Sequence, residues 1–114
     1  MYEDLNFMPT NLEAPPPETV TFIADVTPVE NLLHERGKQY GPFESHAEIT
    51  QSIKRAMHAV DGWMRLSADQ EEALEMIAHK IGRILNGDPN YDDSWVDIAG
   101  YATLVAKRLQ GERI

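Results

Sequence analysis

Eight of the nineteen acidic side chains fall in two short windows, residues 69–75 and residues 88–97. Like charges packed together repel one another, so such clusters cost stability unless a cation or basic side chains compensate. Carboxylate oxygens suit hard divalent cations, and Mg²⁺ takes about six oxygen ligands from carboxylates, waters and substrate phosphates. The two windows therefore predict a cation site for Mg²⁺, with Mn²⁺ as a substitute. A Mg²⁺ ion held in this way can bridge phosphate oxygens and activate water.

The first window opens a stretch with a clear helical pattern. Ser67 and Gln70 match a capping box, and Asn86-Gly87 followed by Asp88-Pro89 marks an end, so a helix is predicted from Ser67 to Asn86. At about 100° per residue, one face of this helix carries a polar strip. Its members are Glu72, Glu75, His79, Arg83 and Asn86. The opposite face is apolar and holds Leu74, Ile77, Ile81, Ile84 and Leu85.

Two interpretations of the polar strip compete. Arg83 can bind phosphate through its planar fork, and Lys80, which lies off the strip, can swing toward a phosphate on its long side chain. An ordinary solvated helix face also places Glu75, His79 and Arg83 at i,i+4 steps. For His79, a hydrogen-bonded or solvated helix histidine is favoured over a ligand.

The second window begins another helix, which Asp92 or Asp93 can cap and which runs to about Gln110. Asp93 and Asp97 share one face, while the other face is apolar and carries Trp95, Ile98, Ala102, Val105 and Leu109. We expect Trp63 and Trp95 in the core. If the two long helices form an antiparallel hairpin, the approach of Glu72 and Glu75 to Asp97 depends on its register. The sequence leaves that register open.

The rest of the chain predicts an all-α domain preceded by an arm. Residues 1–27 read as an extended acidic arm with strand-like character in 19–26, because triple proline at Pro15–Pro17 blocks helix. Residues 28–114 form the helical domain. It begins with a short helix over 28–36 that Gly37 ends, and continues with a helix from about Glu44 to Val60. No strand pairing is evident in 28–114.

Composition excludes several classes of protein. The net charge of −9 argues against binding to a nucleic-acid polymer, and the absence of cysteine excludes disulfides and thiolate metal sites. No apolar run reaches the roughly 18–20 residues of a membrane span. The opening residues show no secretory signal, so a cytoplasmic location is expected.

Two motifs carry a resemblance to a known family. Residues 71–75 read E-E-x-x-E, and residues 93–102 read D-S-W-V-D-I-A-G-Y-A. This pattern resembles the E-E-x-x-E … E-x-x-D signature of the MazG-like all-α nucleoside triphosphate pyrophosphohydrolases. Lys38–Gly41 and Lys80–Arg83 are similar to segments of small MazG-like domains common in bacteriophage genomes. The resemblance covers about residues 30–110.

The resemblance implies a MazG-like helical bundle that works as a homodimer or homotetramer in the cytoplasm, the host's if phage-encoded. It implies Mg²⁺-dependent cleavage of (d)NTP to (d)NMP and pyrophosphate. By motif match, the metal ligands are Glu72, Glu75, Asp93 and Asp97, and Glu71 joins Glu72 as a catalytic residue. The same analogy assigns substrate binding to Lys80, Arg83, Asn86 and His79.

The chain departs from the signature at Ser94, where the family pattern has an acid. Asp93 replaces that acid only if the helix begins irregularly, because it points about 100° away on an ideal helix. The alternative is a non-catalytic protein that binds a nucleotide or a nucleotide-derived signal, as a phage counter-defence sponge would. A third interpretation is a protein-binding helical module.

Overall fold

The computed structural model describes residues 27–113, and all regular structure in that range is helical. Four α-helices, α3 (Thr27–Tyr40), α4 (Phe43–His58), α5 (Ala68–Asn86) and α6 (Asp93–Leu109), are joined by a 3₁₀ helix, η1 (Asp61–Arg65), between α4 and α5. The all-α prediction is confirmed. The extended arm predicted for residues 1–27 lies outside the described residues except for Thr27. No helix within 27–113 has both the length and the apolar character needed to cross a membrane.

The first described helix is longer than predicted. We expected it to end at Gly37, but α3 continues to Tyr40 and stops before Gly41, whose φ of 77° is left-handed. The chain divides into two compact units, residues 1–36 and residues 37–114, and this boundary falls inside α3. Of the first unit, the structure describes Thr27–Arg36, in which no residue is buried. The second unit holds the candidate site.

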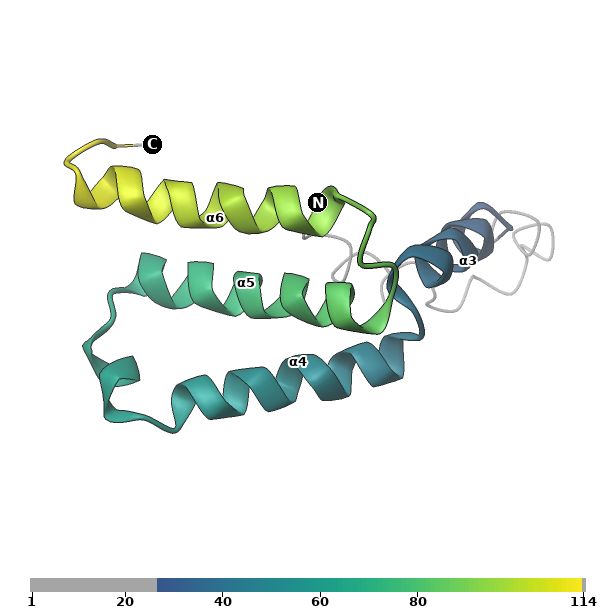
Figure 1. The fold of residues 1–114 in the computed structure, drawn as a ribbon, viewed down its shortest axis with the longest axis horizontal. Coiled ribbons are helices and arrows are strands. Elements are labelled where there is room, and N and C mark those ends of the chain that lie inside the picture. The colour runs from purple at the N-terminus through teal and green to yellow at the C-terminus, as the bar shows by residue number, and fades with distance from the viewer. Residues whose placement is uncertain (1–26, 114) are drawn as a thin grey trace, which may run out of the picture. The chain divides into compact units, whose positions relative to one another are not determined.

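Helices α4, α5 and α6 of the second unit lie side by side with α5 in the middle (Figure 1). The two C-terminal helices, α5 and α6, run antiparallel and pack together, which confirms the predicted hairpin. The predicted capping box is present at the start of α5, where the Ser67 N–H donates to Gln70 Oε1 at 2.9 Å. This local sequence signal therefore sets the residue at which α5 begins.

The turn after α3 is fastened to the end of α5. Asn86 Nδ2 donates to the carbonyl oxygens of Tyr40 at 2.8 Å and Pro42 at 2.9 Å. The Asp88 N–H donates to the Gln39 carbonyl at 2.8 Å. Gly87 allows this close approach, because a Cβ there would collide with the Gln39 carbonyl oxygen and with Tyr40 Cα. The amide of Asn86, which the resemblance assigned to substrate, is used to hold this turn.

Gly87→Ala is expected to destabilise the protein by about 1–3 kcal/mol, because the new methyl group meets backbone atoms that have no room to move. Gly100→Ala is the matched control, since nothing lies within 4 Å of a Cβ at that position. The control should gain up to about 1 kcal/mol from helix propensity. Urea unfolding midpoints measure both, and equal effects from the two variants would contradict the close packing at Gly87.

The interior of the second unit is unusually polar. The buried hydrophobic residues among those described are Ala73 and Ala78. The buried polar residues are His46, Thr50, His79, Lys80, Arg83 and Ser94. Sequence patterning predicted the reverse, with an apolar core and a solvated polar strip. In particular Trp95, expected in the core, is 54% exposed, whereas Trp63 is half-buried. The physical reason is that, within residues 27–113, α5 packs mainly against α4 and α6 on its two flanks, which leaves no helix over its apolar face.

Candidate functional site

The α4 side of α5 holds a pair of buried imidazoles. His46 Nε2 and His79 Nδ1 lie 3.4 Å apart with the rings edge to face, and Thr50 Oγ1 lies 3.4 Å from His46 Nε2. Gly82 lets α4 approach this closely, because a Cβ there would collide with Thr50 Oγ1. Burial is the main cause that lowers the pKa of His46 to about 4 and that of His79 to about 3. Both rings are therefore neutral at pH 7, and His79 serves as a hydrogen-bonded interior histidine.

The α6 side of α5 holds a buried ion pair. Lys80 Nζ lies 2.9 Å from Asp97 Oδ2, in a contact that lacks the alignment of a hydrogen bond. The Lys80 residue is 0% exposed and the Asp97 side chain is 13% exposed. Lys80 therefore neutralises the charge of Asp97 between α5 and α6. In this position it does not reach a surface where it would meet a phosphate.

Asp93 is engaged by the turn that follows α3. Tyr40 Oη donates to Asp93 Oδ2 at 3.0 Å, and the guanidinium carbon of Arg83 lies 4.1 Å from the centre of the Tyr40 ring. Burial, together with this hydrogen bond, raises the pKa of Tyr40 to about 12, although the nearby Arg83 charge opposes the shift. A guanidinium over an aromatic face is a stabilising cation–π contact. The half-buried Tyr40 thus joins the buried Arg83 to the exposed Asp93.

The glutamates predicted to bind metal lie elsewhere along α5. Glu75 Oε2 is 2.8 Å from His58 Nε2 of α4, and Glu72 is exposed. Glu71, the other predicted catalytic acid, is half-buried. The predicted acids therefore face different neighbours, which are α4 for Glu75, α5 for Asp97 and the turn after α3 for Asp93.

The register of the hairpin explains this separation. Lys80 pairs with Asp97, and Asp69 pairs with Arg108 through two contacts of 2.7 Å, so both pairs define the same antiparallel register. At 1.5 Å of rise per residue, Glu72 lies about 12 Å along α5 from the level of Asp97. Glu75 lies about 8 Å from the same level. The glutamates of the first motif and the aspartate of the second therefore lie at different levels along the hairpin.

The donors do not fit a single Mg²⁺ ion. Magnesium needs near-octahedral oxygens at about 2.0–2.1 Å, which requires ligands that converge on one point. Within residues 27–113, no three Asp, Glu or His side chains form a group that could hold a metal ion. Three of the four predicted ligands already contact a histidine, a tyrosine or a lysine of the same chain. Ser94, which stands at the family's acid position, is buried and 2% exposed.

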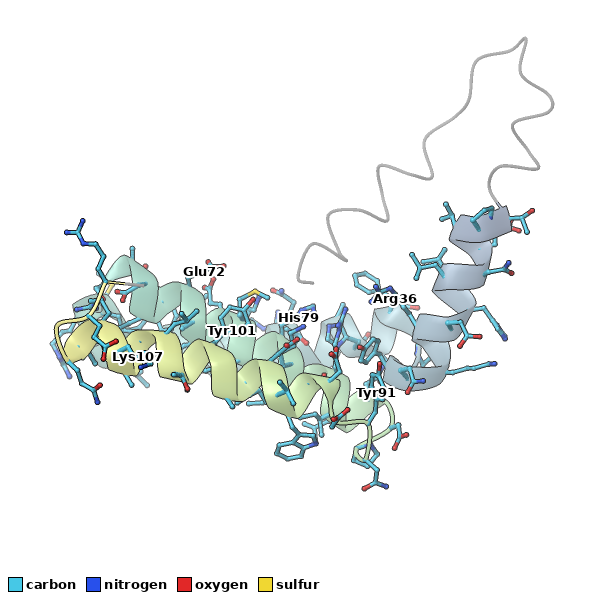
Figure 2. The ribbon with its side chains drawn as sticks, turned by 90° about the horizontal axis from the view of Figure 1, so that it is seen from above. Arg36, Glu72, His79, Tyr91, Tyr101 and Lys107 are labelled. Atoms are coloured by element: carbon cyan, nitrogen blue, oxygen red, sulfur yellow. The ribbon has the colours of Figure 1, made fainter. Side chains whose placement is uncertain are left out.

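A groove between the start of α5 and the end of α6 has the size of a small-molecule site. Its volume is about 540 Å³, within the range of about 300–1,000 Å³ typical of ligand pockets. Glu72 and Tyr101 line it from neighbouring helices (Figure 2). Apolar lining comes from Ala73, Leu104 and Val105, and charged lining comes from Asp69, Arg108, Glu112 and Arg113.

Sequence reasoning did not assign Tyr101 or Arg108 to a site. Both lie on the same helix face as Asp97, at steps of four and then seven residues, so the signal was present in the spacing. Only the register showed that this face meets the start of α5. Glu72 is the single predicted site residue that lines the groove.

Comparison with known proteins gives a family. A model of the DUF6378 family, described as a domain of unknown function, matches residues 27–109. The chain belongs to the DUF6378 family. The matched range contains α3 to α6, so the family domain includes all of the helices described here. No curated protein and no solved structure matches the chain.

Proposed function

We propose that this DUF6378 protein binds a nucleotide or a nucleotide-derived signal in the groove between α5 and α6 and does not hydrolyse it. The observation that carries the proposal is the ion pair between Lys80 and Asp97, which uses the motif aspartate inside the protein. An ammonium group at 2.9 Å supplies the positive charge that a metal ion would otherwise bring to this carboxylate. Binding of the ligand is accordingly independent of Mg²⁺.

The groove offers the contacts that a nucleotide needs. The Tyr101 ring provides a surface for a planar base, and stacking on an aromatic side chain is worth about 1–3 kcal/mol per base. Leu104 and Val105 provide apolar contact beside it. Arg113 brings positive charge to the groove, and phosphate oxygens are natural partners of a guanidinium group. Arg108 also lines the groove, where Asp69 holds it through two contacts of 2.7 Å.

Hydrolysis of nucleoside triphosphates to monophosphate and pyrophosphate is the second candidate, and Glu72 is the observation that favours it. This motif glutamate lines the same groove, so Mg²⁺ brought in with a triphosphate would have one carboxylate to bind. In either case we propose that the protein acts as a homo-oligomer.

Tyr101→Ala is expected to weaken nucleotide binding by about tenfold or more, because it removes the stacking surface. Calorimetry with a panel of NTPs, dNTPs and cyclic nucleotides, each with Mg²⁺ and with EDTA, measures the affinity. Tyr101→Phe should bind normally. Thr103→Ala, an exposed position on α6 outside the groove, should also bind normally.

Chromatography of the recovered ligand distinguishes the candidates. Intact ligand and equal affinity in EDTA support binding without hydrolysis. Release of pyrophosphate that depends on Mg²⁺ and is lost in Glu72→Gln overturns it in favour of the hydrolase. If no nucleotide of the panel binds under either condition, both candidates fail and the protein-binding module is left.

A further inference from the structure

The groove between α5 and α6 carries more negative than positive charge. Its lining includes three carboxylates, Asp69, Glu72 and Glu112, and two guanidinium groups, Arg108 and Arg113. A phosphate monoester brings about 1.5 to 2 further negative charges at pH 7. Each phosphate group that a ligand carries into the groove therefore adds repulsion from the carboxylates, which limits the number of phosphates that the groove can hold.

Most of the lining charges are already paired within the chain. Arg108 binds Asp69 through both Nε and Nη2, each at 2.7 Å. Glu112 Oε1 lies 3.5 Å from Lys107 Nζ. Within residues 27–113, the lining charges without an ion-pair partner are Glu72 and Arg113. One carboxylate and one guanidinium group are therefore available to a ligand.

The register of the α5–α6 hairpin places the groups of the groove in a fixed order. By the two ion pairs that join these helices, Glu72 lies level with Val105 on α6. Tyr101 lies about 6 Å along the axis to one side of this level, and Arg108 lies about 5 Å to the other side. Glu72 and Tyr101 are drawn in Figure 2. An aromatic ring, a carboxylate and a guanidinium group therefore follow one another along the groove.

The turn after α6 brings a second guanidinium group to the Arg108 end of the groove. Helix α6 closes in a Schellman motif, in which the Glu112 N–H donates to the Lys107 carbonyl at 2.9 Å. Gly111 permits the motif, because its φ of 93° lies in the left-handed region that glycine adopts without strain. The chain turns back there, so that Gly111 and Arg113 line the groove.

We propose that the groove selects a ribonucleotide that carries a single phosphate group, either a nucleoside monophosphate or a cyclic mononucleotide. This inference rests on the proposed function, because it names the class of nucleotide that binds in that groove. The base stacks on Tyr101, Glu72 accepts a hydrogen bond from the ribose, and Arg113 binds the phosphate. The order of these three side chains is the order of base, sugar and phosphate in one nucleotide.

Glu72 distinguishes ribose from deoxyribose. An ionised carboxylate accepts hydrogen bonds and donates none, so it fits a hydroxyl donor and repels a phosphate. Acidic side chains bind the ribose 2′-hydroxyl in the same way in dinucleotide-binding folds. A deoxyribonucleotide leaves Glu72 without this donor, which should weaken binding by about tenfold or more.

A second or third phosphate would meet carboxylates at the Arg113 end of the groove. Asp69 already holds the Arg108 guanidinium there, and Glu112 lines the groove beside Arg113. A single guanidinium group is thus left to balance the charge of the ligand, which matches one phosphate and not three. We therefore expect triphosphates to bind more weakly than monophosphates of the same nucleoside.

Calorimetry of the full chain with ribonucleoside 5′-monophosphates, their 2′-deoxy forms, 3′,5′-cyclic forms and triphosphates tests the selection, with Mg²⁺ and with EDTA. The best monophosphate or cyclic form should bind at least about tenfold more tightly than its deoxy form and its triphosphate. In Glu72→Gln, the preference for ribose should shrink and triphosphates should bind more tightly than to the parent protein. Glu44→Gln, the same charge change at an exposed position on α4, should leave all ratios unchanged.

Arg113→Gln tests the phosphate contact separately. It should weaken binding of the monophosphate by about tenfold and leave the affinity for the unphosphorylated nucleoside unchanged. Equal affinity for ribose and deoxyribose forms, or tighter binding of triphosphates, would overturn this inference, while loss of that binding in Tyr101→Ala would still support the proposed function. If no nucleotide binds, the inference and the proposed function fail together.

Discussion

Lys80→Met is expected to destabilise the protein by about 3–5 kcal/mol, because it leaves the Asp97 carboxylate without its counter-charge. Lys80 is fully buried and the Asp97 side chain is 13% exposed, so water cannot replace the lost ammonium group. Urea unfolding at a fixed protein concentration measures the change. The protein concentration is fixed because the proposed homo-oligomer would have a stability that depends on it.

The double variant Lys80→Met/Asp97→Leu should recover most of that loss, since apolar side chains of similar volume often replace a buried ion pair at little cost. Lys107→Met is the surface control. Its partner Glu112 lies 3.5 Å away and both side chains are about half exposed, so the change should stay within about 1 kcal/mol. A loss of that small size for Lys80→Met would show that the buried pair is not formed.

The stability of the protein is expected to fall as the pH is lowered from about 6.5 to about 3. Unfolded imidazoles take up protons near pH 6.5, whereas burial lowers the pKa of His46 to about 4 and that of His79 to about 3 in the folded state. Between these values the unfolded chain binds more protons, so acid favours unfolding, by up to about 1.4 kcal/mol per pH unit for each imidazole. Above pH 6.5 both imidazoles are neutral in the folded and in the unfolded state, so they do not make the stability depend on pH.

Urea midpoints measured from pH 8 to pH 4 test this prediction. In His79→Gln, the slope below pH 6.5 should be smaller than in the parent protein, because one of the two buried bases is gone. In His34→Gln, the slope should be unchanged, because His34 is exposed on α3. Equal slopes for the parent protein and His79→Gln would contradict the burial of the imidazole pair.

The register of the α5–α6 hairpin decides whether the two acidic motifs can meet at one metal ion. E-E-x-x-E and D-x-x-x-D are defined by spacing along the chain, but a metal site needs donors that converge in space. In this protein the residue opposite Asp97 is a lysine, and the residue opposite Asp69 is an arginine. One acid of each window is therefore compensated by a basic side chain of the same chain, which is another way to relieve clustered negative charge.

The sequence by itself determined the local structure. The capping box at Ser67 set the start of α5, and apolar spacing at three and four residues set its length. These signals depend on residues within one or two helical turns of each other, so they can be recognised in the sequence alone. The end of the first helix was the exception. Gly37 remained helical, and the chain turned at Gly41 instead.

Only the tertiary structure decided what the helix faces meet. Periodicity placed Glu72, Glu75, His79 and Arg83 on one strip, but it could not show that α4 covers part of that strip and buries two histidines there. Spacing could not show that Lys80, which lay off the strip, closes on Asp97 in the interior. The physical reason is that register and partner choice are set by contacts between residues far apart in sequence. A helix face is polar or apolar by itself, but it is inside or outside only by virtue of what packs against it.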